Sequence, residues 1–85
     1  MYRLILSDGT EFNARFCSAI DGILTLSIFS ENDFAYIAEQ FLDSEKTARI
    51  TFRYGTSQDV FDDYTDLRLI NHATNGEYII SLKKV

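Results

Sequence analysis

The residues of this chain that could carry chemistry are few, and their densest group is acidic. Four carboxylates occur close together, at Asp59, Asp62, Asp63 and Asp66. Hard cations such as Ca²⁺ take oxygen ligands, but an EF-hand loop needs carboxylates at alternate positions and a glycine at the sixth, and this spacing has neither. A solvated loop accounts for the cluster equally well. A small metal- or ligand-binding domain that uses residues 59–66 is therefore kept only as an alternative interpretation.

The single histidine and the single cysteine do not complete a catalytic or metal-binding pattern. His72 has no Cys or His at ligand spacing, and a lone histidine near a turn is usually solvated. Cys17 has only Arg15 nearby to stabilise a thiolate, which favours an inert thiol. None of the P-loop, G-x-S-x-G, G-x-G-x-x-G, H-E-x-x-H and C-x-x-C motifs occurs. We therefore expect a protein without catalytic residues or a cofactor, and not an enzyme.

A row of cations alternates with aromatic residues between positions 49 and 54. Arg49 and Arg53 point to one face of a strand, whereas Phe52 and Tyr54 point to the other. An RNA-binding strand would need the aromatic residues that stack on bases and the cations that bind phosphates on the same side. The net charge of −5 also opposes binding to phosphates. The arginines are instead expected to face solvent or an acidic protein partner, including a second copy of the chain. We expect no nucleic-acid partner.

Composition bounds the architecture. Eighty-five residues can bury one core, so residues 1–85 are expected to form a single domain. No apolar run approaches the roughly 18 residues of a membrane helix, and the short apolar run after Met1 is too short for a signal peptide. We therefore expect no membrane partner and a cytoplasmic protein. The one cysteine excludes an internal disulfide, so packing must supply the stability.

The chain is predicted to be organised around one amphipathic helix at Ser30–Asp43. Its apolar residues recur with the helical period, at Phe34, Ile37, Ala38, Phe41 and Leu42. Ser30 with Asp33 forms a weakened capping box, because Asp is shorter than the usual Glu or Gln. A stripe of this kind needs a sheet to cover.

Strand patterns of period two flank the helix on both sides. Three strands precede it, at Tyr2–Leu6, Thr10–Phe16 and Ile23–Phe29; three follow it, at Ala48–Tyr54, Leu67–Leu69 and from Tyr78 onward. Cys17–Asp21 is predicted as a short connection and Gly55–Asp63 as the longest loop, anchored by Val60 and Phe61. The fold class is therefore α+β: an antiparallel six-stranded sheet or open barrel in the order βββαβββ, with one helix packed on one face.

Several apolar side chains fall on the strand faces opposite the main apolar rows. These residues are Ile5, Ile23, Phe29, Ile70 and Ile79. Something is expected to cover them: the sheet curls into a small barrel, the loop with Val60 and Phe61 folds across, or another subunit packs there. The interaction candidates that follow are Arg49, Arg53, Arg68, Ile5, Ile79, Val60 and Phe61.

Four segments together resemble small uncharacterised proteins of phage and prophage structural clusters in Gram-positive bacteria. They are L-S-D-G-T-E-F from Leu6 to Phe12, the central F-x-x-I-A-E-Q-F-L-D, Y-T-D-L-R-L-I from Tyr64 to Ile70, and the closing I-S-L-K-K. The resemblance implies an accessory virion or assembly role exercised by docking to other chains, and in that case a virion location. It transfers no site residue.

The expectation from these observations is a non-enzymatic structural or interaction module. It would self-associate as a homo-oligomer or dock to other proteins, as an accessory phage or prophage assembly protein does. An alternative is a small acidic inhibitor, of the nucleic-acid-mimic type, which would occupy a basic partner's binding surface through the net charge of −5. The metal- or ligand-binding domain at residues 59–66 is the other alternative.

Overall fold

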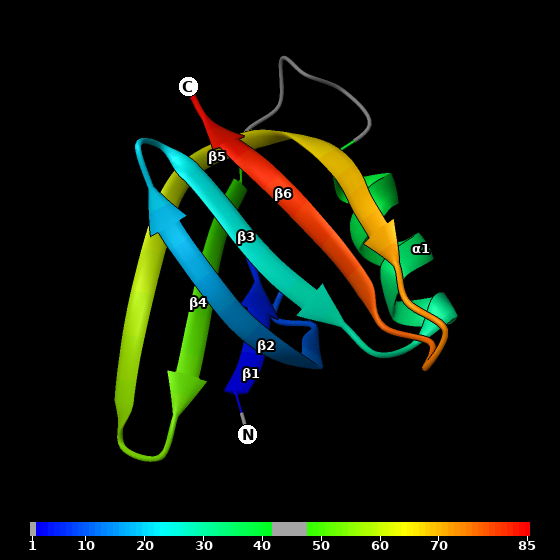
Figure 1. Cartoon of the computed structure of the whole chain (residues 1–85). Coiled ribbons are helices and arrows are strands. Elements are labelled where there is room, and N and C mark those ends of the chain that lie inside the picture. Colours follow the sequence, from blue (N-terminus) through cyan, green and yellow to red (C-terminus); the bar gives the residue numbers. More distant parts are fainter. Residues whose placement is uncertain (1, 42–47) are drawn as a thin grey trace.

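The computed structural model describes residues 2–41 and 48–85, and these form six strands and one helix. The strands are β1 (Tyr2–Leu6), β2 (Glu11–Ile20), β3 (Ile23–Ile28), β4 (Ala48–Tyr54), β5 (Ser57–His72) and β6 (Tyr78–Lys84); the helix is α1 (Glu31–Gln40). Figure 1 shows their arrangement. The predicted order of three strands, a helix and three strands is confirmed.

The six strands close into a barrel in the order β1-β2-β3-β6-β5-β4, and every neighbouring pair is antiparallel. The alternatives of an open sheet or open barrel were therefore wrong. The ring closes because β4 pairs with β1, with Leu4 opposite Phe52 and Leu6 opposite Ile50. The apolar rows of the strands consequently face one enclosed interior rather than one side of a flat sheet.

Strand β5 is the element that the sequence patterns missed. Residues 55–63 are not a long loop: Gly55, with φ of 60°, forms a tight turn, and β5 begins at Ser57 and runs for 16 residues. Its first part pairs with β4 and its second part with β6. The register shifts along β5, and Asp63 and Asp66 have φ of 64° and 56° at these irregularities. Bulges bend a strand, so β5 can pass from one neighbour to the other.

Strand β2 also continues further than predicted. The segment Cys17–Asp21, predicted as a connection, is mostly strand, because β2 extends to Ile20. Only Asp21 and Gly22 form the turn to β3. A bulge between Phe16 and Ser18 interrupts the alternation, which is why the pattern of period two stops at Phe16.

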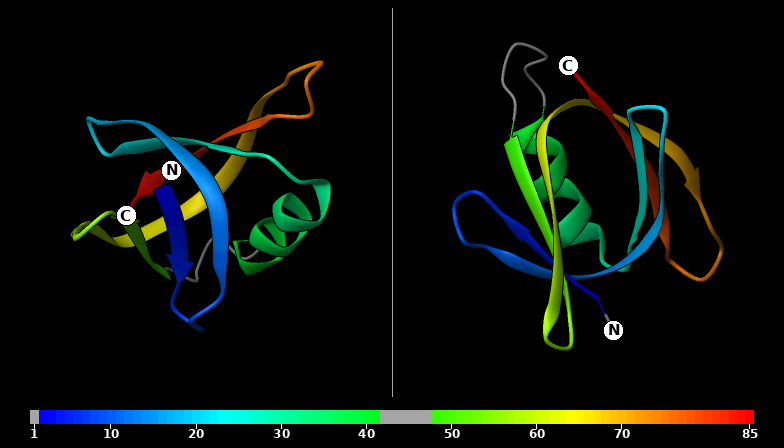
Figure 2. Two further views of the ribbon diagram at one scale, coloured as in Figure 1. Left: turned by 90° about the horizontal axis from the view of Figure 1, so that it is seen from below. Right: turned by 90° about the vertical axis from the view of Figure 1, so that its left-hand side faces the viewer.

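Helix α1 begins where the capping residues predict. Ser30 is its N-cap, and the Ser30 side chain accepts a hydrogen bond of 3.4 Å from the backbone N–H of Asp33. The helix ends at the C-cap Phe41, whose N–H donates to the carbonyl of Ala38. Leu42 and Asp43, predicted as its last residues, lie outside the described residues. In the right-hand view of Figure 2, α1 is seen behind the ring of strands, so it lies at one end of the barrel rather than on the face of a sheet.

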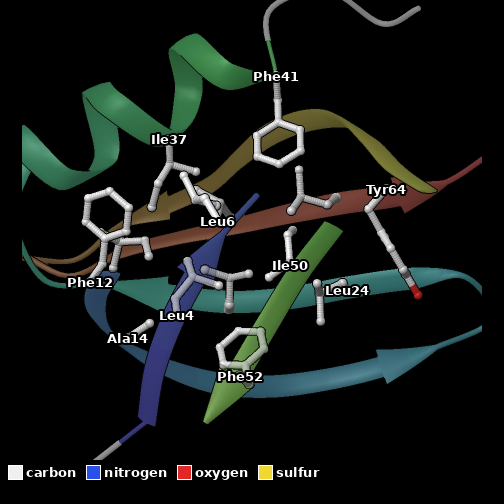
Figure 3. Packing of buried hydrophobic residues seen from close by; sticks show 14 residues of the cluster. Leu4, Leu6, Phe12, Ala14, Leu24, Ile37, Phe41, Ile50, Phe52 and Tyr64 are labelled. Atoms are coloured by element: carbon white, nitrogen blue, oxygen red, sulfur yellow. The ribbon is translucent and has the colours of Figure 1, made fainter. Parts of the chain in front are cut away.

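The core fills the barrel interior and joins the helix to it. Ile37 and Phe41 are 1% and 3% exposed, and in Figure 3 they extend from α1 toward Leu6 and Ile50. The remaining buried apolar residues come from the inner faces of the strands: Leu4, Leu6, Phe12, Ala14, Leu24, Leu26, Ile28, Ile50, Phe52, Tyr64, Ile80 and Leu82. Burial of these side chains supplies the main stabilising term.

Candidate functional site

The four aspartates singled out for metal binding do not converge. Asp62 accepts a hydrogen bond from Arg49 at 2.6 Å, Asp66 accepts one from Arg68 at 3.3 Å, and Asp59 accepts one from the Tyr54 hydroxyl at 3.0 Å. Asp63 occupies a left-handed backbone position in the bend of β5. Among residues 2–41 and 48–85, no group of three or more His, Cys, Asp or Glu side chains could hold a metal ion. The carboxylates therefore serve separate local contacts and bends.

His72 and Cys17 also have local packing roles. The His72 ring stacks on Tyr78 with centroids 4.0 Å apart, and Tyr78 stacks on Phe34 of α1 at 4.6 Å. This stack ties the helix to the end of the β5–β6 hairpin. Cys17 is exposed, and its Sγ lies 3.6 Å from the Ser27 hydroxyl. Both residues therefore take part in local contacts.

A shallow depression lies elsewhere on the surface. Its volume is about 400 Å³, and the described residues that line it are Tyr2, Ala14, Arg15 and Phe29. Arg15 is the one charged residue among these, and its Nη2 is 2.6 Å from Oε1 of Glu77, a residue that is only 8% exposed. Ligand pockets usually combine apolar walls with several convergent polar groups. The described lining has no such set, so it gives no ground for a small-molecule site.

The register of the strands gathers a different set of side chains on the outer wall of the barrel. Arg3 of β1 lies opposite Arg53 of β4, and Ile5 of β1 lies opposite Thr51. Thr51 in turn lies opposite Val60 of β5. Because alternate residues point outward, these residues and Arg49 share one face. We call this set the arginine–aliphatic face: Arg3, Ile5, Arg49, Thr51, Arg53 and Val60.

Ion pairs fix the arginines at the edges of this face. Arg53 Nη2 is 2.6 Å from Glu11 Oε1, and Arg49 Nε is 2.6 Å from Asp62 Oδ1. The hydrogen bond and charge of Asp62 raise the pKa of Arg49 above its ordinary value. Both arginines stay largely accessible, with side chains 64% exposed for Arg49 and 48% for Arg53. They can therefore contact a partner while paired within the chain.

The face differs in charge from the rest of the molecule. It holds three arginines, and the two carboxylates paired with them are Glu11 and Asp62, which gives a formal charge of +1. The whole chain carries −5, so the remainder carries −6. Between the arginines lie Ile5, which is partly buried, and Val60, which is 45% exposed. The surface thus combines an aliphatic centre with a weakly basic border on an acidic protein.

The structure brings together four of the predicted interaction residues and separates the others. Ile5, Arg49, Arg53 and Val60 belong to the arginine–aliphatic face. Phe61 instead packs against the core and stacks on Phe16 with centroids 5.9 Å apart.

Arg68 and Ile79 lie away from the face, in the part of the wall where β5 pairs with β6. Arg3 was missed, because only the pairing of β1 with β4 places it beside the candidates. Thr51 shares the outward side of β4 with Arg49 and Arg53 but was not named as a candidate. The alternation in each strand gave the outward side, but not the neighbouring strand.

No protein-family model matches the chain, and no curated protein or solved structure is significantly similar to it. Within the described residues, no helix is long and apolar enough to cross a membrane.

Proposed function

We propose that this protein is a non-enzymatic interaction module that docks to another protein chain through the arginine–aliphatic face. The observation that carries the proposal is the register that sets Ile5, Thr51 and Val60 side by side between Arg49 and Arg53. Aliphatic side chains at the centre of a patch with a charged border are typical of a protein-binding surface. Charges at the border then steer the partner and fix its orientation.

The resemblance to phage and prophage proteins supports an accessory role in assembly. In that role the module would join a larger protein complex, either in the cytoplasm or as part of a virion. A barrel whose interior is filled by side chains suits such a role, because its function then lies on its outer surface.

A second candidate function uses the rest of the surface. The rest of the chain, outside the three arginines of the face and their partners Glu11 and Asp62, carries a formal charge of −6. An acidic surface of this kind could occupy the nucleic-acid-binding surface of a basic protein. This is the inhibitor function, and its binding would depend on carboxylates and not on Ile5 or Val60.

Paired variants distinguish the two functions. In the first, Ile5→Asp with Val60→Asp places charge in the aliphatic centre; in the control, Ile70→Asp changes a residue that is 57% exposed and lies off the face. Each tagged protein is used to capture partners from producing cells, which are identified by mass spectrometry, at about 0.1 M and about 1 M salt.

Docking through the face predicts a partner that the wild type and the Ile70→Asp variant both bind and the double variant does not. The inhibitor function predicts a basic partner that all three proteins bind and that high salt releases. Partners that survive both the double variant and high salt would overturn both proposals. Circular dichroism spectra of all variants establish that they are folded.

A further inference from the structure

We infer that the partner of the arginine–aliphatic face is helix α1 of a second copy of the chain, so that copies associate head to tail. This inference rests on the proposed docking function and names its occupant. The two surfaces are separate on the molecule, because α1 lies at one end of the barrel and the face lies on its wall (Figures 1 and 2). One copy can therefore offer its helix to one neighbour and its face to another.

The solvent side of α1 carries acidic residues at a regular spacing. Glu31, Ala35 and Glu39 are all exposed and follow one another at intervals of four residues, so they lie on one side of the helix. Eight residues separate the two glutamates along the chain, which corresponds to about 12 Å along the helix axis. No lysine or arginine occurs within Glu31–Gln40. The helix thus presents two carboxylates with a small apolar residue between them.

The arginine–aliphatic face has the opposite charges at a matching spacing. Arg49 and Arg53 lie four residues apart on the outer side of β4, which corresponds to about 13 Å along a strand. Thr51 lies midway between them, flanked by Ile5 and Val60 on the neighbouring strands. When Glu31 and Glu39 contact the two arginines, Ala35 lies over this aliphatic centre. The helix and the face therefore match in both charge and spacing.

The ion pairs within the chain leave the arginines able to bind these carboxylates. A guanidinium group has five N–H donors. Arg49 uses its Nε to bind Asp62, and Arg53 uses one Nη2 donor to bind Glu11. The remaining N–H donors of each largely exposed guanidinium group can bind a second carboxylate. The second copy thereby places a second carboxylate beside each arginine, in addition to Asp62 and Glu11.

Contacts between unlike surfaces have a consequence for assembly. A helix-to-face contact is heterologous, so copies add one after another until the rotation between them closes a ring, or grow as a filament when it does not. The border contacts are ionic and exposed, so high salt weakens the association. The purified protein should accordingly form species larger than the 9.8 kDa monomer at low salt and lose them at about 1 M salt.

Two double variants with the same change in net charge test the helix. Glu31→Gln with Glu39→Gln removes the two helix carboxylates, whereas Asp21→Asn with Asp66→Asn removes two carboxylates elsewhere. Both substitutions of the control variant replace an Asp at positive φ, which Asn also tolerates. Sedimentation velocity across protein concentration should show association of the helix variant weakened by about tenfold or more, with the control close to wild type. Equal effects of the two double variants would overturn the inference.

Mixing variants tests the head-to-tail arrangement. Arg53→Glu disables the face and keeps the helix, whereas Glu31→Gln with Glu39→Gln disables the helix and keeps the face. Each variant alone should be mainly monomeric, and an equimolar mixture should form a one-to-one pair that grows no further. Arg68→Glu, on an arginine outside the face, should assemble as the wild type does. A wild-type chain that stays monomeric at high micromolar concentration, or variants that dimerise alone, would overturn the inference.

These outcomes are separable from those for docking in general. A purified wild-type chain that is monomeric, together with a captured partner that depends on Ile5 and Val60, would leave the docking function standing and remove α1 as the occupant.

Discussion

The inner and outer sides of strand β4 differ in everything except their backbone. On the inner side, Ile50 and Phe52 are each 1% exposed and belong to the core. On the outer side, Arg49 and Arg53 are largely exposed and paired with carboxylates of other strands, Asp62 on β5 and Glu11 on β2. The period of two in one strand thus separates two tasks. The inner residues hold the barrel closed, and the outer residues are free to contact another chain.

The largest loss of stability is expected when a charge is placed in the core. Phe41→Asp would put a carboxylate where a side chain is 3% exposed, at the point where α1 meets the barrel. The cost of burying that charge is comparable with the whole stability of a small domain, so the variant should be unfolded. Circular dichroism and thermal melting measure this. Gln40→Asp, at an exposed neighbouring position, should remain folded; a folded Phe41→Asp protein would show that the helix does not contribute to the core.

A cavity on the inner side of β4 is the next largest change. The Phe52 ring has edge-to-face contacts with Tyr2, Phe16 and Phe61, at centroid distances between 5.5 and 6.4 Å. Phe52→Ala should lower the free energy of unfolding by about 3–5 kcal/mol. Chemical denaturation measures the loss. On the outer side of the same strand, Arg53→Ala should change it by no more than about 0.5 kcal/mol. Similar losses at the two positions would contradict the separation of the two sides.

A smaller effect concerns the exposed contact between α1 and the β1–β2 turn. The Tyr36 hydroxyl donates a hydrogen bond to Asp8, and this bond lowers the pKa of the Asp8 carboxyl below its ordinary value. The folded state therefore favours the ionised carboxylate. The resulting stability is present above about pH 4 and is lost as the pH falls through the lower folded pKa.

Tyr36→Phe removes this hydrogen bond. The difference in unfolding free energy between wild type and variant should be constant near neutral pH and should shrink in acid. Denaturation curves measured from about pH 2 to pH 7 would show it. A difference that grows toward acid would contradict the assignment of the bond to an ionised Asp8.

Tyr54 provides the opposite dependence on pH. Its hydroxyl donates to Asp59, and this hydrogen bond, together with the negative charge, raises the pKa of Tyr54. The stability from this contact is present below about pH 10 and is lost as the pH rises through the higher folded pKa. The difference in unfolding free energy between the wild type and Tyr54→Phe should therefore become smaller at alkaline pH, as measured by denaturation. A difference in unfolding free energy that is seen only in acid would show that the hydrogen bond to Asp59 does not stabilise the protonated Tyr54 hydroxyl.

The smallest expected effect on stability comes from the outer side of β4. Arg53→Glu breaks an exposed ion pair with Glu11, so the fold should be retained, with a melting temperature close to that of the wild type. The effect should instead fall on association, measured by light scattering. An unfolded Arg53→Glu protein would mean that the outer side of β4 also holds the barrel together.

Much of this fold followed from local patterns. The helix start at Ser30, its apolar stripe through Ile37 and Phe41, and most of the inner rows of the strands agree with the structure. The alternation at Leu67 and Leu69 is an exception, because Leu69 is 48% exposed where the register of β5 is irregular. The long strand β5 did not follow, because Asp63 and Asp66 interrupt its alternation where the backbone bends. A run of polar residues with irregular spacing indicates a loop, although here it crosses from one neighbouring strand to another.

The sequence predicted only some of the residues of the candidate site. Outward alternation identified Ile5, Arg49 and Arg53, but it gave no reason to prefer them to Arg68 or Ile79. Val60 was predicted to anchor a loop to the core, and this was wrong, because Val60 is 45% exposed on β5 opposite Thr51. Closure of the barrel made that choice, because the pairing of β1 with β4 sets Ile5 opposite Thr51 and Arg3 opposite Arg53.

The sequence by itself determined which side of the regularly alternating strands faces the core and where the helix begins, because these depend on the period of two, the helical period and a capping residue. Strand β5 is the exception, because its alternation is interrupted. Only the tertiary structure decided that the sheet closes and which outward residues share a face. Strand order and register depend on contacts between residues far apart along the chain, and the alternation within one strand carries no information about its neighbour.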